Sequence, residues 1–309
     1  MFSFIASQIL NGLGESIRYA LIAVGFTLFF GVLNVIVFCV GDIATIGVFL
    51  ILGLYLLVGS FGLFSALPSI LSFSILVILG SLLTGFFGIL IERVGVKPFR
   101  KSNPVIPLIA TVSLGIVIRE SISLFYPRGR DPHQFPDFLP SGVTMIGEIR
   151  LTHQDLSMIL IAVIIFTALF WVVNRTRFGR AIRAIAQNRD AAIMMGIDVN
   201  RTYRYTFFLV GLVMGLSGFL MGSFLGSVRY DMGLREGIIG FSAAVVGGLG
   251  NIYGAVLGGL LFGIIEAMTM AFVPMGGAYK DVVCFSAIIF FMIFKPSGII
   301  GEKISGEKV

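Results

Sequence analysis

The sequence predicts an all-α polytopic membrane protein, and three observations support this fold class. Of its 309 residues, 57% are hydrophobic and only 12% are charged, about half the charged share of an average soluble domain. Apolar runs recur along the whole chain, and a membrane-spanning helix needs on the order of 20 such residues. Two short loops between the runs are rich in Arg and Lys. The composition excludes a soluble fold and leaves room for roughly eight or nine spans.

The apolar runs define the expected spans, which must be helical because the hydrocarbon offers no water to an open backbone. They lie near residues 19–40, 42–58, 69–91, 105–125, 156–173, 206–228, 238–250, 252–273 and 281–295. We expect residues 1–309 to form a single transmembrane domain. The run at 238–250 is short for a span. It is therefore either a full crossing or a broken, re-entrant helix, and the glycines after it serve either close helix packing or a substrate-facing break.

The two basic loops predict the orientation of the chain. Residues 92–103 carry four basic residues against one acidic, and residues 174–204 carry seven arginines against two aspartates. Such loops mark the cytoplasmic side. The stretch 126–155, with three arginines and four acidic residues, then becomes an external loop. Three spans before Glu92 place the N-terminus outside, without a charged signal-peptide region, and the tail from Lys295 falls inside if residues 238–273 cross twice.

The loop 174–204 has the pattern of a folded cytoplasmic element. Arg177, Arg180 and Arg183 recur at helical spacing, with Phe178 and Ile182 on the other side. This predicts a short amphipathic helix at the membrane surface. Asn188 or Asp190 can begin a second helix through Ala191 to Met195, and Gly196 can end it. Positive-inside topology or lipid headgroups would also account for the arginines.

This loop resembles the coupling loop of ABC-transporter permeases of the branched-chain amino acid family. The family pattern is met by Gly179, Arg180, Ala181, Arg183, Ala184, Ala186, Asn188, Ala191, Ala192, Gly196 and Ile197. Three further stretches, at residues 19–34, 108–114 and 246–259, are similar to other parts of the same family. Together they cover most of the chain and indicate the LivH-like member rather than its longer LivM-like partner.

The resemblance implies a non-catalytic transport subunit in a bacterial inner membrane. Its implied partners are two cytoplasmic ATPase subunits, a second, LivM-like permease in a heterodimer, a soluble substrate-binding protein and membrane lipid, with no nucleic acid. The chain has no G-x-x-x-x-G-K-S/T motif, so ATP would be bound by the partners and the chain itself would need no cofactor. The expected ATPase-coupling residues are Arg180, Arg183, Ala184, Asn188, Ala191, Ala192 and Gly196.

The family commonly has I-N-F-A-H-G-D/E after its first span, whereas this chain has Ile36 to Asp42 without the Asn and His. The implied cargo is a branched-chain or related hydrophobic amino acid, with urea or short amides as an alternative. A zwitterion needs a few dipoles in an otherwise apolar passage, and ionisable groups inside spans are costly and therefore candidates for function. The candidate pathway residues are Asn34, Asp42, Thr111, Ser113, Gly247, Gly248, Gly250, Asn251 and Glu266.

The remaining polar residues give less information about function. Cys39 and Cys284 lie in apolar runs and are expected to be buried thiols. His133 and His153 lie in the external loop without the spacing of a metal site. No arrangement typical of catalysis is present. An ion-coupled secondary transporter and a membrane assembly protein remain as alternative classes. Arg119, Glu120 and Asp281 are expected near the ends of their spans, where pairing or snorkelling would satisfy them.

Overall fold

The computed structural model describes residues 2–60, 69–100, 102–103, 105–140, 142–146, 149–295 and 298–300. Its α-helices and strands are α1 (Phe2–Leu33), α2 (Val40–Ser60), α3 (Ser69–Ile91), α4 (Val105–Phe125), β1 (His133–Gln134), β2 (Val143–Ile146), β3 (Ile149–Thr152), α5 (His153–Arg175), α6 (Arg177–Gln187), α7 (Arg189–Met194), α8 (Val199–Leu225), β4 (Ser227–Val228), α9 (Met232–Gly247), α10 (Ile252–Phe272) and α11 (Gly276–Phe294). A π-helical turn, Glu92–Val96, and a 3-10 turn, Lys97–Phe99, continue α3.

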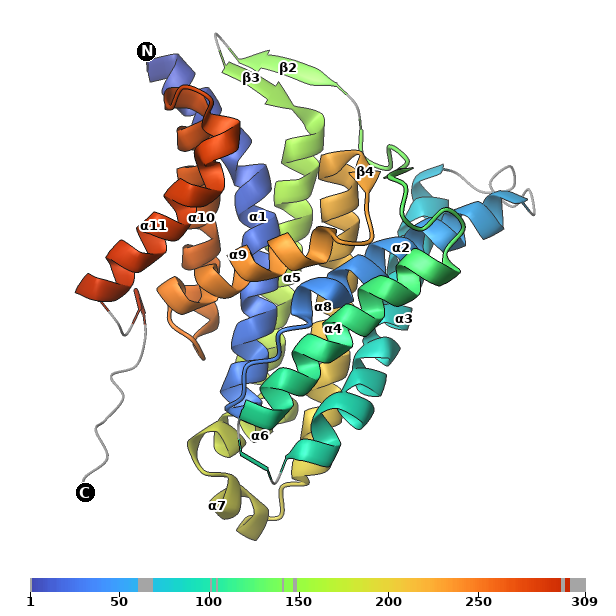
Figure 1. Cartoon of the computed structure of the whole chain (residues 1–309), viewed down its shortest axis with the longest axis vertical. Helices are drawn as coiled ribbons and strands as arrows, with labels where there is room; N and C mark the ends of the chain where they lie inside the picture. The colour runs from blue at the N-terminus through green and yellow to red at the C-terminus, as the bar shows by residue number, and fades with distance from the viewer. Residues whose placement is uncertain are drawn as a thin grey trace.

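The all-α membrane fold is confirmed. Within the described ranges, eight helices are long and apolar enough to cross a membrane, namely α1 to α5, α8, α10 and α11. The N-terminal end of α1 and the pair α6 and α7 lie at opposite ends of the molecule (Figure 1). The basic loop carried by α6 and α7 marks the cytoplasmic end, so α1 starts at the external end.

The prediction for the first span was wrong in its boundaries. The helix α1 begins at Phe2 and ends at Leu33, whereas the apolar run suggested residues 19–40. Asn34 has a left-handed backbone with φ of 51°, a conformation that ends helices. Its N–H donates to the carbonyl oxygen of Phe30 at 2.9 Å. The apolar residues that follow therefore belong to a non-helical segment, Val35 to Cys39.

The helix α1 forms the centre of the bundle. It packs along α10 and also contacts α5, α8 and α9, while α2 and α3 pack on α8. Only a small part of α4, α5 and α11 is buried in the chain itself. These peripheral helices present apolar side chains outward, as expected for surfaces that face lipid or another membrane subunit.

The short helix α9 resolves the doubt about residues 238–250. It has 16 residues and runs obliquely across the middle of the bundle, in front of α1 and α8 (Figure 1). Its start packs on the start of α2 through glycines. A Cβ atom on Gly41 would lie 2.0 Å from the carbonyl oxygen of Gly233, so any larger residue would separate the two helices. Gly41 and Gly233 therefore serve close packing, and α9 is a short oblique helix.

The helices α9 and α10 form a helical hairpin, joined by a short turn. Gly248 and Gly250 have positive φ values of 110° and 92°, which glycine adopts without strain. The side chain of Asn251 accepts hydrogen bonds from the N–H groups of Tyr253 and Gly254 and begins α10. After α11 the chain returns to this turn, where Ile299 N donates to Val246 O at 2.8 Å. The last residues described thus lie against the end of α9.

The external loop is more structured than predicted. The strands β2 and β3 form an antiparallel hairpin, and β1 pairs with β4, which follows α8. These pairs were not predicted, because two to four residues carry too little periodicity to be recognised. The loop also ends three residues earlier than expected, since α5 begins at His153.

Candidate functional site

The segment from Asn34 to Cys39 is the first unusual feature inside the bundle. Because it is non-helical, α2 starts midway along the long axis of the molecule and not at its cytoplasmic end (Figure 1). The first helical hydrogen bond joins Ile43 N to Cys39 O at 2.9 Å. The N–H of Phe38 donates to Thr111 Oγ1 of α4 at 3.2 Å. Thr111, a predicted pathway residue, therefore holds the break between α1 and α2 in place.

Asp42, in the first turn of α2, is the buried charge nearest this break. Its side chain is 6% exposed, and Oδ1 lies 3.7 Å from Nη1 of Arg119 on α4. That separation is too long for a hydrogen bond. Within the described part of the chain, neither Asp42 Oδ1 nor Arg119 Nη1 has a hydrogen-bond partner. The structure thus joins two predicted candidates, Asp42 and Thr111, to the start of α2.

Aromatic rings cover the other side of the break. The ring centroids of Phe26, Phe38 and Phe241 lie 5.3 to 6.4 Å apart, in the range of favourable aromatic pairs. Phe38 and Phe241 remain partly exposed. The rings connect α1, the break and α9 in one apolar contact.

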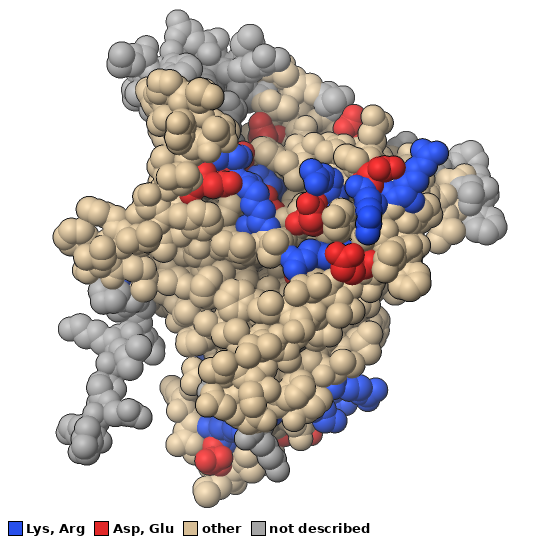
Figure 2. Space-filling view, viewed as in Figure 1, with Lys and Arg blue, Asp and Glu red and all other residues tan. Residues whose placement is uncertain are grey.

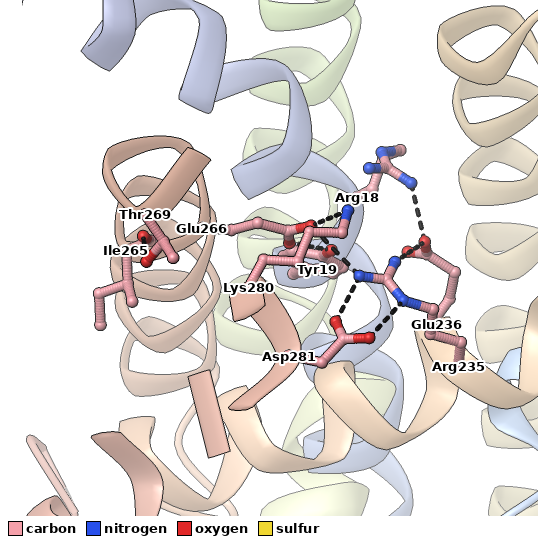
Figure 3. Close-up of polar contacts among 9 residues, drawn as sticks. All are labelled: Arg18, Tyr19, Arg235, Glu236, Ile265, Glu266, Thr269, Lys280 and Asp281. Atoms are coloured by element: carbon pink, nitrogen blue, oxygen red, sulfur yellow. Dashed lines mark hydrogen bonds and ion pairs between the residues drawn. The ribbon is translucent and has the colours of Figure 1, made fainter. Parts of the chain in front are cut away.

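A second group of charges, which we call the charged network, joins four helices. Its members are Glu15, Arg18, Tyr19, Arg235, Glu236, Glu266, Lys280 and Asp281, and Figure 3 shows all but Glu15. Arg18 Nη1 of α1 lies 2.9 Å from Glu236 Oε1 of α9. Glu266 of α10 accepts from the Tyr19 hydroxyl and from Lys280 Nζ, the latter at 2.5 Å. The network therefore fastens α9, α10 and α11 to α1.

Arg235 bridges the buried and the accessible parts of the network. Its Nη2 atom lies 2.6 Å from Asp281 Oδ1 and 3.2 Å from Glu266 Oε1. The side chains of Arg235 and Asp281 are 38% and 45% exposed, whereas Glu266 is 1% exposed. Figure 2 shows acidic and basic side chains gathered in the upper, external half of the visible face. A buried charge is stable only when it is paired, and this network supplies the partners.

The cytoplasmic loop, residues 174–198 with α6 and α7, forms the third feature. Thr176 Oγ1 accepts from Gly179 N at 3.1 Å and begins α6. Asn188 Oδ1 accepts from the N–H groups of Asp190 and Ala191 and begins α7. Gly196 has a φ of 79° directly after α7. The predicted two-helix element, its cap and its terminator are confirmed.

A small apolar core attaches this loop to the bundle. It consists of Val32, Ile182, Ile185, Ala192, Val199 and Tyr203, with Leu33, Phe178, Ala184 and Ile197 packed against it. Val32 and Leu33 end α1, and Val199 begins α8. The loop is therefore packed directly against the end of the central helix and the start of α8.

The arginines of this loop have different environments. Arg183 donates from Nη1 to the carbonyl oxygen of Val173, near the end of α5. The side chain of Arg180 is exposed and makes no hydrogen bond or ion pair to another described residue. Nearby, burial lowers the pKa of Arg100, while its partner Glu92 opposes that shift. Arg183 thus holds the loop, and Arg180 is free to meet another molecule.

The tip of α7 is apolar and exposed. Ile193, Met194 and Met195 are 51%, 86% and 82% exposed. Ala191 and Gly196 are exposed beside them, and Ala192 is buried beneath. Large apolar side chains that project from a basic cytoplasmic surface form a patch suited to a protein contact.

The other predicted pathway residues lie apart from one another. Asn34 is exposed at the cytoplasmic end of α1, and Ser113 is exposed on α4, where its hydroxyl donates to Ile109 O. Gly247, Gly248, Gly250 and Asn251 form the turn between α9 and α10. Glu266 belongs to the charged network. The structure therefore does not gather the nine candidates into one site.

The sequence analysis missed five charged members of the network. Glu15 and Arg18 preceded the predicted first span, and Arg235, Glu236 and Lys280 preceded the runs at 238 and 281. The signal that could have found them is the spacing of Glu15, Arg18 and Tyr19, which lie three and four residues apart on one helix face.

The cysteines and histidines have ordinary environments. Cys39 and Cys284 are buried and free, as predicted for structural thiols. His153 Nε2 lies 2.7 Å from Thr144 Oγ1, and His133 Nε2 lies 3.2 Å from Arg128 O. Among the residues that the structure describes, no group of three His, Cys, Asp or Glu side chains could hold a metal ion.

Comparisons with known proteins match nearly the whole chain. The family model described as branched-chain amino acid transport system / permease component matches residues 8–292. The high-affinity branched-chain amino acid transport permease protein BraD of Pseudomonas aeruginosa is 34% identical, over 96% of this chain and 95% of its own length.

Two further relatives are less similar to this chain. The corresponding LivH protein of Salmonella typhimurium is 29% identical over 97% of each chain. The fructose import permease FruG of Bifidobacterium longum is 27% identical, over only 48% of this chain and 42% of its own. No solved structure matches the chain.

Proposed function

The chain belongs to the permease family of branched-chain amino acid transport systems, and from that premise we propose its role in full. It is the inner-membrane permease subunit of an ATP-binding cassette importer for branched-chain or related hydrophobic amino acids. A soluble binding protein delivers the cargo outside, and two separate cytoplasmic ATPase subunits bind and hydrolyse ATP. A second, LivM-like permease completes the pathway, and this chain supplies no catalytic group or cofactor.

The single observation that carries this proposal is the cytoplasmic loop. Its α6 and α7 pack on the ends of α1 and α5 and on the start of α8. Its surface exposes Met194 and Met195 at the tip of α7 and, on α6, Arg180, which makes no hydrogen bond or ion pair to another described residue. An ion-coupled transporter would need no such element. A groove on an ATPase that accepts Met194 and Met195, with acidic groups near Arg180, fits this surface.

The packing of α6 and α7 against α1 and α8 explains how ATP could drive transport. Closure of the ATPase pair would displace α7 and α6, and the apolar core would pass that displacement to α1 and α8. The helix α1 carries the charged network and contacts the oblique helix α9. Access would therefore switch between two arrangements of α1 and α9, each favoured by a different state of the ATPase.

The cargo follows from the full-length relatives, which are named for branched-chain amino acids. Urea or short amides, and sugars, are less favoured, since no full-length relative is named for them and the fructose permease matches only about half the chain. This chain lacks the Asn and His that the family commonly has before Asp42. Its preference among the side chains of the transported amino acids is therefore to be measured.

The test is reconstitution of the complete complex in proteoliposomes with its binding protein. We expect ATP-dependent uptake of labelled leucine, isoleucine or valine, and co-purification of two ATPase subunits and a second permease. In Met194→Glu, uptake and stimulated ATP hydrolysis should fall at least about tenfold, since a charge is placed in an apolar contact. Met194→Leu is the matched control and should retain both. Wild-type uptake by Met194→Glu would refute the docking role, and uptake without ATPase subunits would refute the transporter class.

A further inference from the structure

The ion pair of Asp42 and Arg119 has the longest separation among the ion pairs of the described chain. In the charged network, direct contacts of 2.5 to 3.2 Å join Arg18, Lys280 and Arg235 to carboxylates. The Asp42 to Arg119 separation is 3.7 Å, and both facing atoms lack a hydrogen bond. A buried pair stabilises a fold only when its geometry is good and its remaining bonds are satisfied. A purely stabilising role therefore explains this pair poorly.

The surroundings of the pair suit a small molecule with two opposite charges. Asp42 lies in the first turn of α2, whose opening N–H groups have no acceptor within their own helix. The start of a helix carries partial positive charge. A carboxylate can therefore meet both the Arg119 guanidinium and the start of α2, while an ammonium group meets Asp42. An α-amino acid carries both charges on one carbon atom.

An apolar cavity, which opens toward the outside of the bundle at Leu57, Val117 and Phe125, begins one helical turn from this pair. Its volume is about 610 Å³, and it lies between α2, α3 and α4. Ile46, one turn after Asp42, and Ile118, the neighbour of Arg119, belong to its wall. Of its eighteen lining residues only Ser121 and Tyr126 are polar. An aliphatic side chain attached to a bound head group would enter this cavity and lose its contact with water.

The pair can open because α4 is lightly held. Only 22% of the most apolar stretch of α4 is buried in the chain, against 67% for the corresponding stretch of α2. Its contact with α2 passes through Gly115, where a Cβ atom would lie 2.3 Å from Asp42 Oδ2. With no side chain at Gly115, a small outward shift of α4 separates Asp42 from Arg119. A zwitterion that enters the gap gives each charge a new partner, so no charge is left buried alone.

We propose that Asp42 and Arg119 bind the head group of the transported amino acid, Asp42 the ammonium and Arg119 with the start of α2 the carboxylate. The aliphatic side chain lies in the cavity between α2, α3 and α4. In the arrangement described here the site is closed, and the two side chains face each other. This assignment rests on the proposed transport function and names the groups that would select a zwitterion.

The experiment measures binding to the complete permease and ATPase complex in nanodiscs, without the binding protein. The probe is tritiated leucine. The competitors are leucinamide, which lacks the carboxylate, and 4-methylpentanoate, which lacks the ammonium. The wild type should prefer leucine to each competitor by at least about tenfold, because each competitor leaves one buried charge unpaired. Arg119→Gln should weaken leucine about tenfold or more and leave leucinamide unchanged. Asp42→Asn should weaken leucine similarly and leave 4-methylpentanoate unchanged.

Two controls separate binding from folding. Glu120→Gln removes the neighbouring, exposed charge of α4 and should change none of the three affinities. Arg119→Lys keeps the charge and should retain part of the selectivity against leucinamide. If each variant weakens all three ligands equally, the pair is only structural and the proposal is overturned. It is also overturned if a complex that imports leucine binds none without its binding protein, whereas a complex that imports no amino acid refutes the proposed function itself.

Discussion

The charged network and the cytoplasmic loop both contain arginines, but the exposure and the pairing of these arginines differ between the two regions. In the network, Arg18 is 2% exposed and its Nη1 atom is bonded to Glu236. In the loop, Arg180 is exposed and has no partner in the described chain. The difference follows from the solvent, because a charge in hydrocarbon must be paired, while a charge at a membrane surface is hydrated. The network therefore holds the fold, and the loop offers its charges to other molecules.

The largest expected effect comes from Glu266→Leu, which removes the acceptor shared by Tyr19, Lys280 and Arg235. Because Lys280 then loses its carboxylate partner and the buried Tyr19 hydroxyl loses its acceptor, the free energy of unfolding should fall by about 3–5 kcal/mol. Thermal unfolding of the purified protein in detergent measures it. Glu120→Leu, an identical change on the exposed face of α4, should be close to neutral. Equal effects of the two substitutions would show that burial of the network is not what matters.

Arg18→Met should come next, at about 3 kcal/mol, because Glu236 loses its close partner while it stays buried. The double variant Arg18→Met with Glu236→Leu should recover most of the loss, since apolar residues replace both charges and Arg235 keeps Glu266 and Asp281. The same unfolding measurement gives both values. A double variant as unstable as the sum of its single changes would contradict the pairing.

Arg183→Gln should have a moderate effect that is confined to the loop. The guanidinium holds the Val173 carbonyl near the end of α5, and loss of a charged hydrogen bond at a partly exposed site costs about 1 kcal/mol. Hydrogen exchange of residues 177–194 should become faster, while exchange in α1 and α10 stays unchanged. Faster exchange throughout the protein would show that Arg183 supports the whole bundle.

Arg180→Gln should have the smallest effect on stability, within about 0.5 kcal/mol, as for an unpaired surface residue. Its effect should fall on coupling instead, with uptake and ATP hydrolysis reduced several-fold in proteoliposomes. An unchanged transport rate would leave topology and lipid contact as the whole role of Arg180. A large loss of stability would contradict its exposed position.

Sequence alone predicted most of the fold, because apolar runs and basic loops respond to the bilayer directly. It also predicted the two-helix loop with its cap at Asn188, since capping and helical spacing are local. The break after Asn34 was missed, because its residues are apolar and only their backbone leaves the helix. Five charged members of the network were missed for a different reason. Arg18 and Glu236 are 218 positions apart, and no local pattern contains a contact of that length.

The distance between Arg18 and Glu236 has a consequence for biogenesis. The ribosome delivers α1 to the membrane, with its arginine, long before α9 exists. Until Glu236 arrives, Arg18 must reach toward the lipid headgroups or a water-filled insertion channel. The helix α9, short and with Arg235 and Glu236 near its start, is a poor insertion signal by itself. We expect it to enter together with α10, and the first helix to settle at its final depth only when the last third of the chain is made.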